Sequence, residues 1–155
     1  MELTRNLMVE SVGRLDPVRP LCVDAGETVA AAVRLMRNER VGCLLVVQNG
    51  ELVGIFTERD LLKRVLARGE PLDTPMTAVM TAQPVAVNVL DSVRTAVERM
   101  QAGGYRHVPV VDEGNRPVGV LSAKRIIRYL AEHFPTTVYN QPPDPHRVPE
   151  TQYGA

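Results

Sequence analysis

Apolar residues recur at helical spacing in two separate parts of the 155-residue chain. In each part the residues at positions i, i+4 and i+7, which share one face of a helix, are apolar. They are Val29, Val33 and Met36 in the first part and Val93, Val97 and Met100 in the second. Glu27 or Thr28 is placed to open the first helix, and Asp91 is the predicted N-cap of the second.

Both predicted helices are followed by the pattern of a β-hairpin and then by another helix. The apolar runs "CLLVV" and "LVGIF" flank a turn that contains Asn49-Gly50, and "HVPVV" and "PVGVL" flank a turn that contains Glu113-Gly114. A glycine in the turn favours the chain reversal. The helices expected after the hairpins cover 58–68 and 123–133, and the short apolar stretches that open the units, each after a proline, cover 20–23 and 84–87.

The chain therefore contains one unit twice. Val29 aligns with Val93 at an offset of 64 residues, and Gly54 aligns with Gly119 at an offset of 65, because the second turn is longer. Each unit reads β-α-β-β-α and is too small to bury much surface alone. We expect an α/β (α+β) fold in which two repeats pack sheet to sheet around a shared core with approximate twofold symmetry. The expected boundaries are 9–68 for the first repeat, 69–76 for a linker, 77–133 for the second repeat and 134–155 for a proline-rich tail.

Composition narrows the class of protein. Eighteen basic residues balance eighteen acidic ones, which argues against a nucleic-acid partner, and no apolar run is long enough to cross a bilayer. The start of the sequence lacks the pattern of a signal peptide, so a cytoplasmic protein without a membrane partner is expected. Cys22 and Cys43 lie in apolar runs without further ligands at metal-binding spacing, and they are expected to be buried free thiols.

The blocks "VGCLLVVQNGELVGIFTERDLL" and "YRHVPVVDEGNRPVGVLSAKRII", with the lead-in "VMTAQPVAV", resemble the cystathionine-beta-synthase (CBS) domain family in its tandem form. The resemblance covers roughly residues 9–133. It implies a stand-alone regulatory module, not an enzyme, that binds an adenosine-containing ligand such as AMP, ADP, ATP or an adenosyl compound in clefts between the repeats. It also implies a homodimer formed through helices and a separate effector protein that receives the signal.

Thr57 and Asp60 form the main candidate site, three residues apart where a strand meets a helix. A carboxylate there can accept hydrogen bonds from two ribose hydroxyls, and the threonine hydroxyl can donate to a phosphate oxygen. The first amides of the helix would add further donors. The same stretch also fits a capping box that needs no ligand, so both interpretations stay open.

The resemblance implies the other walls of the Asp60 cleft by position. They are Ile55, Phe56, Pro84, Val85, Tyr105 and Arg106. The apolar members would enclose a purine, backbone groups at Val85 would read its edge, and Arg106 could pair with a phosphate. The alternative is that Tyr105 simply packs and that Arg106 is a solvated surface charge.

The second repeat departs from this pattern, because Ser122 keeps the hydroxyl while Arg125 replaces the acid. Lys124 and Arg125 place positive charge in the first turn of a helix, which opposes the helix dipole at a cost of up to about 1 kcal/mol. A bound anion would relieve that cost, so this cleft is expected to be empty or to hold a phosphate. Alternatively, both side chains point into water. His107, at the start of a strand beside this cleft, is expected to be a core or edge histidine.

The sequence contains no recognised catalytic motif. A G-x-S-x-G motif, a Walker loop and an H-E-x-x-H motif are all absent from the sequence. The leading prediction is a nucleotide-sensing regulatory module that requires no cofactor or metal and uses an adenine nucleotide as its regulatory ligand. The alternative is a ligand-free protein–protein interaction module that acts through its helical face or its proline-rich tail.

Overall fold

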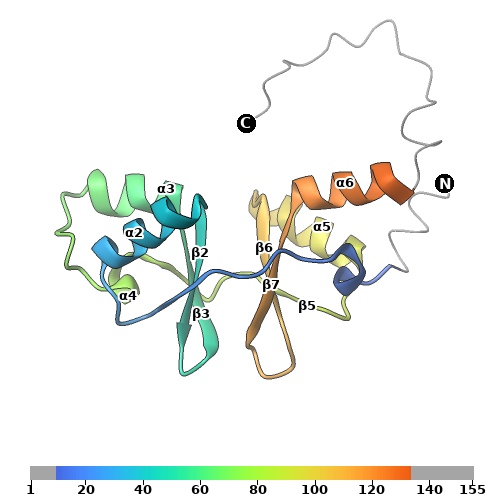
Figure 1. The fold of residues 1–155 in the computed structure, drawn as a ribbon, viewed down its shortest axis with the longest axis horizontal. Helices are drawn as coiled ribbons and strands as arrows, with labels where there is room; N and C mark the ends of the chain where they lie inside the picture. The colour runs from blue at the N-terminus through green and yellow to red at the C-terminus, as the bar shows by residue number, and fades with distance from the viewer. Residues whose placement is uncertain (1–9, 134–155) are drawn as a thin grey trace, which may run out of the picture.

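The computed structural model describes residues 10–133 and contains the two predicted β-α-β-β-α repeats (Figure 1). The first repeat consists of β1 (Cys22–Asp24), α2 (Val29–Glu39), β2 (Cys43–Gln48), β3 (Glu51–Thr57) and α3 (Glu58–Asp60), which continues as η2 (Leu61–Leu66). The second consists of β5 (Val87–Asn88), α5 (Val93–Gly103), β6 (His107–Val111), β7 (Pro117–Ser122) and α6 (Ala123–His133). Each repeat is preceded by a lead-in, which holds η1 (Val12–Leu15) in one case and α4 (Met76–Val79) with β4 (Thr81–Ala82) in the other. The proline-rich tail at 134–155 lies outside the described residues.

The long helices begin at hydroxyl-bearing caps. The side chain of Thr28 accepts a hydrogen bond from the amide of Ala31 at 3.2 Å. Thr28 is one of the two residues predicted to open α2. Ser92 plays the same part for α5 and accepts the amide of Thr95 at 3.1 Å. The prediction of Asp91 as this cap is wrong, because its carboxylate accepts an amide of the preceding turn instead. Either side chain satisfies an amide that the first turn leaves without a partner.

The helix after β3 departs from the predicted range of 58–68. It ends at Leu66, and from Leu61 onward it is a π-helix. The amide of Ala67 accordingly donates to the carbonyl of Leu62, five residues earlier, at 2.9 Å. Its counterpart α6 keeps α-helical geometry over the whole predicted range, 123–133. The two repeats are therefore similar but not identical at the position where each hairpin meets its last helix.

The two sheets face each other at the centre of the molecule, and the helices lie outside them (Figure 1). One sheet has the order β1-β2-β3-β4 and the other β5-β6-β7, with the first pair of each parallel and the hairpin antiparallel. Leu44 and Val46 of β2 enter the core on the helix side. Leu45 points to the opposite face, since side chains alternate along a strand, and it is also fully buried. Its counterpart Pro109 in β6 is buried too, so the inner faces of both sheets contribute to the contact between the repeats.

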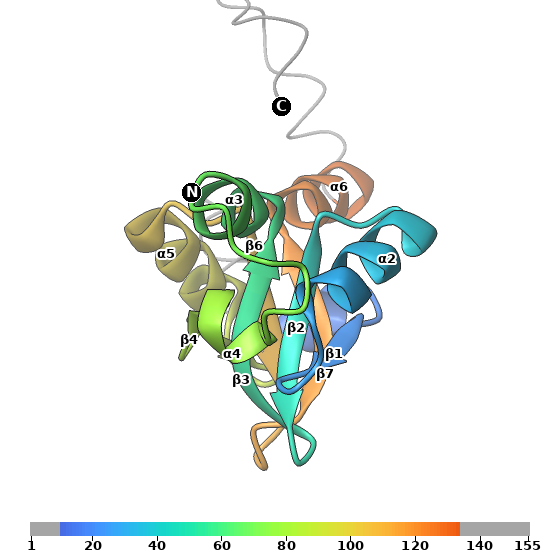
Figure 2. The same cartoon turned by 90° about the vertical axis from the view of Figure 1, so that its left-hand side faces the viewer.

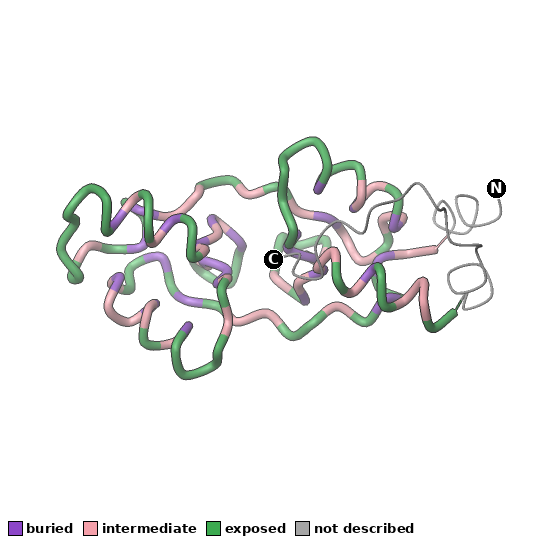
Figure 3. The backbone as a smooth tube through the Cα atoms, turned by 90° about the horizontal axis from the view of Figure 1, so that it is seen from above, coloured by how far each residue is buried: buried purple, intermediate pink, exposed green. Residues whose placement is uncertain are grey.

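The expectation of one shared core needs correction. The buried residues form two clusters, one under the helices of each repeat, and Figure 3 shows buried stretches in both halves of the molecule. The repeats are joined by the contact between their sheets and also by exchange of their lead-ins. Val12 and Leu15, which precede the first repeat, lie in the core of the second, and Met76 and Val79, which precede the second, lie in the core of the first.

Short strand pairings continue this exchange beyond the cores. Val18 forms an isolated antiparallel bridge with Val120 of β7, and Thr81 pairs with Ile55 of β3. Figure 1 shows the blue N-terminal segment crossing from the side of α5 and α6 to the side of α2. Each lead-in thus crosses from one repeat to the other and pairs with a strand of the sheet in the opposite repeat, the first with β7 and the second with β3.

The cysteines differ from their predicted burial. Both are free thiols, as expected, but Cys22 is exposed and Cys43 is half-buried. The apolar run around Cys22 is correctly read as a strand, but alternation along β1 buries Val23 and leaves Cys22 outside. None of the helices within residues 10–133 combines the length and apolar character that a membrane span requires.

Candidate ligand-binding clefts

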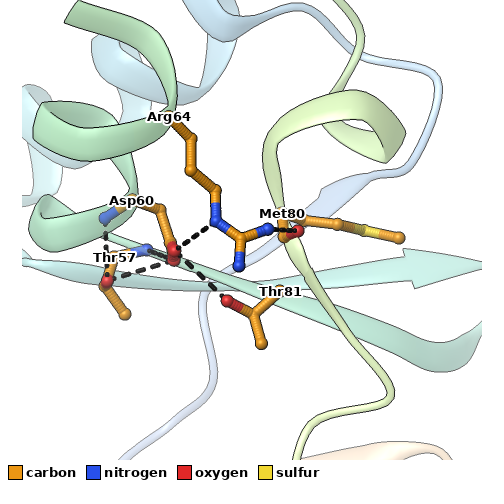
Figure 4. Close-up of polar contacts among 5 residues, drawn as sticks. All are labelled: Thr57, Asp60, Arg64, Met80 and Thr81. Atoms are coloured by element: carbon orange, nitrogen blue, oxygen red, sulfur yellow. Dashed lines mark hydrogen bonds and ion pairs between the residues drawn. The ribbon is translucent and has the colours of Figure 1, made fainter. Parts of the chain in front are cut away.

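Asp60 and Thr57 meet at the start of α3, where they form the predicted capping box (Figure 4). The amide and the hydroxyl of Thr57 donate to Oδ2 of Asp60 at 2.9 and 3.1 Å. The amide of Asp60 donates in return to Oγ1 of Thr57 at 3.3 Å. These contacts hold the carboxylate at the junction of β3 and α3 without any ligand.

The other carboxylate oxygen of Asp60 contacts groups that sequence reasoning did not single out. Oγ1 of Thr81 donates to Oδ1 of Asp60 at 3.2 Å, and Nε of Arg64 lies 3.4 Å from the same oxygen. Arg64 also donates to the carbonyl of Met80 at 2.7 Å. Asp60 is 7% exposed and is the one buried polar or charged residue between positions 10 and 133. Every group around it is a donor, as the hydroxyls of a ribose would be.

The remaining predicted walls of the Asp60 cleft do not all lie where expected. Ile55 is half-buried and pairs with the lead-in that continues to Pro84 and Val85. Phe56 requires a correction, because its ring is fully buried in the first helix-side core and offers no wall to a ligand. Alternation explains this, since Ile55 and Phe56 point to opposite faces of β3.

Tyr105 and Arg106 both lie at the surface just before β6. Tyr105 is 46% exposed, and its ring lies directly over Gly103, a position where a larger residue would collide with it. This close contact corresponds to the packing alternative for Tyr105. Arg106 contributes a positive charge near His107.

A cavity of about 300 Å³ lies between the repeats on the Ser122 side. Its lining residues are Val18, Arg19, Leu21, Arg40, Val41, Gly42 and Cys43 from the first part of the chain and His107, Val120 and Ser122 from the second repeat. His107 and Ser122 are register partners in β6 and β7, so the structure brings these two predicted residues together. The residues from the first part of the chain were missed. The repeats are related by an offset of 64 residues, which maps Val85 onto Leu21 and Tyr105 onto Val41. Applying this offset to the predicted walls of the Asp60 cleft would have identified Leu21 and Val41.

The electrostatics of this cavity favour an anion. Arg19 and Arg40 bring positive charge, and none of the acidic residues between positions 10 and 133 contributes to the lining. Burial, Arg106 and Lys124 lower the pKa of His107 below its usual value, so its imidazole is mostly neutral at pH 7. His107 is exposed at the first position of β6, the middle strand of its sheet, so it lies at the end of a strand and is not a core histidine. Burial and the nearby Asp60 raise the pKa of Cys43 to about 11, so the thiol stays protonated.

Arg125 corrects both predictions made for it, since it neither enters the cavity nor points into water. Its Nε donates to the carbonyls of Leu15 and Asp16, each at 3.1 Å, and its NH2 group forms an ion pair with Oδ2 of Asp16 at 3.1 Å. It therefore fastens the first lead-in to α6. Lys124 is exposed and does not line the cavity either. The positive charge of the Ser122 cleft comes from the opposite repeat instead.

The structure therefore contains two β-α-β-β-α units in tandem, with a cavity between them. The family model for the CBS domain matches residues 9–67 and 76–132, and the chain therefore belongs to the CBS domain family, with two copies in tandem. Within the described part of the chain, no three His, Cys, Asp or Glu side chains gather closely enough to hold a metal ion.

Similar proteins include both short and long chains. CBS domain-containing protein YhcV of Bacillus subtilis is 34% identical over 100 residues, which cover 64% of this chain and 71% of that protein. Meiotically up-regulated gene 70 protein of Schizosaccharomyces pombe is 39% identical over 104 residues, but the 66% of this chain that aligns spans 14% of its length. The solved structure of CBS domain protein PAE2072 from Pyrobaculum aerophilum, complexed with AMP, has a TM-score of 0.70 at 27% identity and covers 79% of this chain and 99% of that one.

Proposed function

We propose that this protein is a non-catalytic regulatory module that binds an adenine nucleotide between its two CBS repeats. The cavity on the Ser122 side is the observation that carries the proposal. Both repeats line it, its volume of about 300 Å³ lies at the lower end of the range for small-molecule sites, and its charge is positive. The AMP complex of the similar protein PAE2072 supports this choice of ligand class.

The lining suggests how a nucleotide would be held. Val18, Leu21 and Val41 offer apolar surface for a purine. Arg19 and Arg40 would pair with the phosphate. Ser122 would add a hydroxyl, although its oxygen already accepts the amide of Arg125 at 3.1 Å and caps α6. Among the described residues no carboxylate lines this cleft to bind a ribose, so the phosphate would be the main determinant of affinity.

The Asp60 cleft would select a different part of the ligand. There the carboxylate of Asp60 would accept the ribose hydroxyls, and Thr57, Ile55, Pro84 and Val85 would complete the site. The hydroxyl of Thr57 donates its one hydrogen to Oδ2 of Asp60, so Thr57 would hold the carboxylate in place for the ribose and would not donate to a phosphate. The two clefts would therefore be unequal, and the module would pass its ligand state to a separate effector protein in the cytoplasm.

Adding AMP should stabilise the full chain against heat. At a concentration about 100 times the dissociation constant, binding adds roughly 2.7 kcal/mol, which corresponds to a rise in Tm of roughly 5 to 10 °C for a chain of this size. Differential scanning fluorimetry with AMP, ADP, ATP, NAD and S-adenosylmethionine measures this directly. Adenine base alone is the control for non-specific effects. An unchanged Tm with all five ligands would contradict the proposed function.

We further propose that the module forms a homodimer through the face that carries α3, η2 and α6. These helices lie on the same upper face of the molecule (Figure 2). Leu62, Leu66 and Ile127 project from them and are 60%, 59% and 66% exposed. Large apolar side chains gathered on one face are typical of a protein contact.

Replacing Leu62 and Ile127 together with Asp should convert the dimer into a monomer, because two charges would have to be buried on each side of the interface. Light scattering after gel filtration measures the mass. Leu72→Asp is the matched control, since Leu72 is 58% exposed but lies in the segment between the repeats. A wild-type chain that is monomeric at tens of micromolar would contradict the proposed interface.

A further inference from the structure

The carboxylate of Asp60 joins two segments that belong to different repeats. Its Oδ2 accepts two hydrogen bonds from Thr57, inside the capping box of α3. Its Oδ1 faces the lead-in of the second repeat, where it accepts a hydrogen bond from the hydroxyl of Thr81, and it also forms an ion pair with the guanidinium of Arg64 in η2. Arg64 in turn donates to the carbonyl of Met80, the residue before Thr81. Figure 4 shows these groups converging on the carboxylate from α3 and from the lead-in.

A carboxylate offers about four acceptor positions, two on each oxygen. In Asp60 three of them already accept hydrogen bonds, two from Thr57 and one from Thr81, and the oxygen that accepts from Thr81 is also ion-paired with Arg64. A ribose diol brings two further donors, so it can bind only by replacing existing partners. Removing the Thr57 contacts would uncap α3, which costs about 1 kcal/mol or more. Removing the partners of Oδ1 leaves the cap intact, and Arg64 keeps its bond to Met80.

The equivalent position in the second repeat is built differently. Arg125 donates to the carbonyls of Leu15 and Asp16 and pairs with the Asp16 carboxylate. It offers no acceptor for which a ribose hydroxyl could compete. Two of the bonds from Arg125 go to backbone carbonyls of the first lead-in and do not depend on a carboxylate, whereas the hydroxyl of Thr81 in the second lead-in binds the same carboxylate that a diol would use.

We propose that a nucleotide in the Asp60 cleft displaces the hydroxyl of Thr81 from Oδ1 and so loosens the 80–86 segment that joins the repeats. This inference rests on the proposed function, and it adds a regulatory contact to the same site. The loosening stays local because Met76 and Val79 remain in the first core. Beyond them, β4 pairs with β3 at two positions, Thr81 with Ile55 and Ala82 with Gly54, and the amide of Gln83 adds one more bond to the carbonyl of Val53 at 3.2 Å. Thr81 thus sets the affinity of the Asp60 cleft and transmits its occupancy to the connection between the repeats.

The test compares Thr81→Val, which removes the hydroxyl, with Thr81→Ser, which keeps it. Calorimetry on the full chain gives the affinities for AMP and for its 2′,3′-dideoxy analogue, which has no diol. Loss of a competing hydrogen bond should tighten AMP binding to Thr81→Val roughly three- to tenfold, with dideoxy-AMP unchanged. Thr81→Ser should match the wild type. The dideoxy analogue also accounts for any AMP held by phosphate in the Ser122 cavity.

Amide hydrogen exchange supplies a second readout on the wild-type chain. Saturating AMP should speed exchange in the 80–86 segment and leave the 11–18 segment unchanged. Weaker or equal AMP binding by Thr81→Val, or unchanged exchange at 80–86 while the wild type binds AMP, would overturn this inference alone. If the wild type binds neither nucleotide, the proposed function and this inference fall together.

Discussion

Leu15→Ala should lower the free energy of unfolding by about 2 to 5 kcal/mol, a large part of the 5 to 15 kcal/mol typical of a small protein. Leu15 is 2% exposed and packs in the core of the second repeat, although it precedes the first. Its removal would leave a cavity beside Val12 and the helices of the second repeat. Urea unfolding at a fixed protein concentration measures the loss, and the slope of the transition should stay the same.

Leu90→Ala is the matched control for this variant. Leu90 lies at the start of the second repeat and is 78% exposed, so the same substitution should change stability by no more than about 0.5 kcal/mol. Equal losses for the two variants would show that the lead-in does not contribute to the second core. A small loss for Leu15→Ala alone would have the same meaning.

The duplication was readable because it depends on local patterns. Alternation, helical spacing and the turn glycines each repeat in order, and together they predict the β-α-β-β-α unit and the tandem fold. The exchange of lead-ins was not readable. Val12 and Met76 are apolar in either arrangement, and nothing local indicates which of two similar cores each of them enters. Which core a lead-in packs into depends on the path that the chain takes between the two repeats in three dimensions.

The candidate site shows the same division between local and distant information. The capping box of Thr57 and Asp60 is a short-range pattern, and it is present as one of the two predicted alternatives. The contacts of Asp60 with Thr81 and of Arg125 with Leu15 join residues 21 and 110 positions apart, and no spacing rule predicts them. Arg125 lies in the first turn of α6, as predicted, but the helix dipole does not determine where a long, flexible side chain points.

The positive charge of the Ser122 cavity leads to the second large expected effect. Arg19→Glu should weaken AMP binding in this cavity roughly ten- to hundredfold, because it changes the local charge by two units beside a phosphate dianion. Adenosine carries no phosphate, so its affinity should not change. Isothermal titration calorimetry at low and high salt measures both, and the salt dependence of AMP binding should be smaller in the variant.

Arg116→Glu makes the same change of charge at a distance from the cavity, in the exposed turn between β6 and β7. It should leave AMP affinity within about twofold of the wild type, since exposed charges beyond a Debye length are largely screened. Equal weakening by both substitutions would mean that AMP responds to overall charge. If Arg19→Glu binds AMP as tightly as the wild type, the phosphate lies outside this cavity. If AMP affinity falls in Arg19→Glu but not in Arg116→Glu, the phosphate binds at the wall that the first repeat supplies.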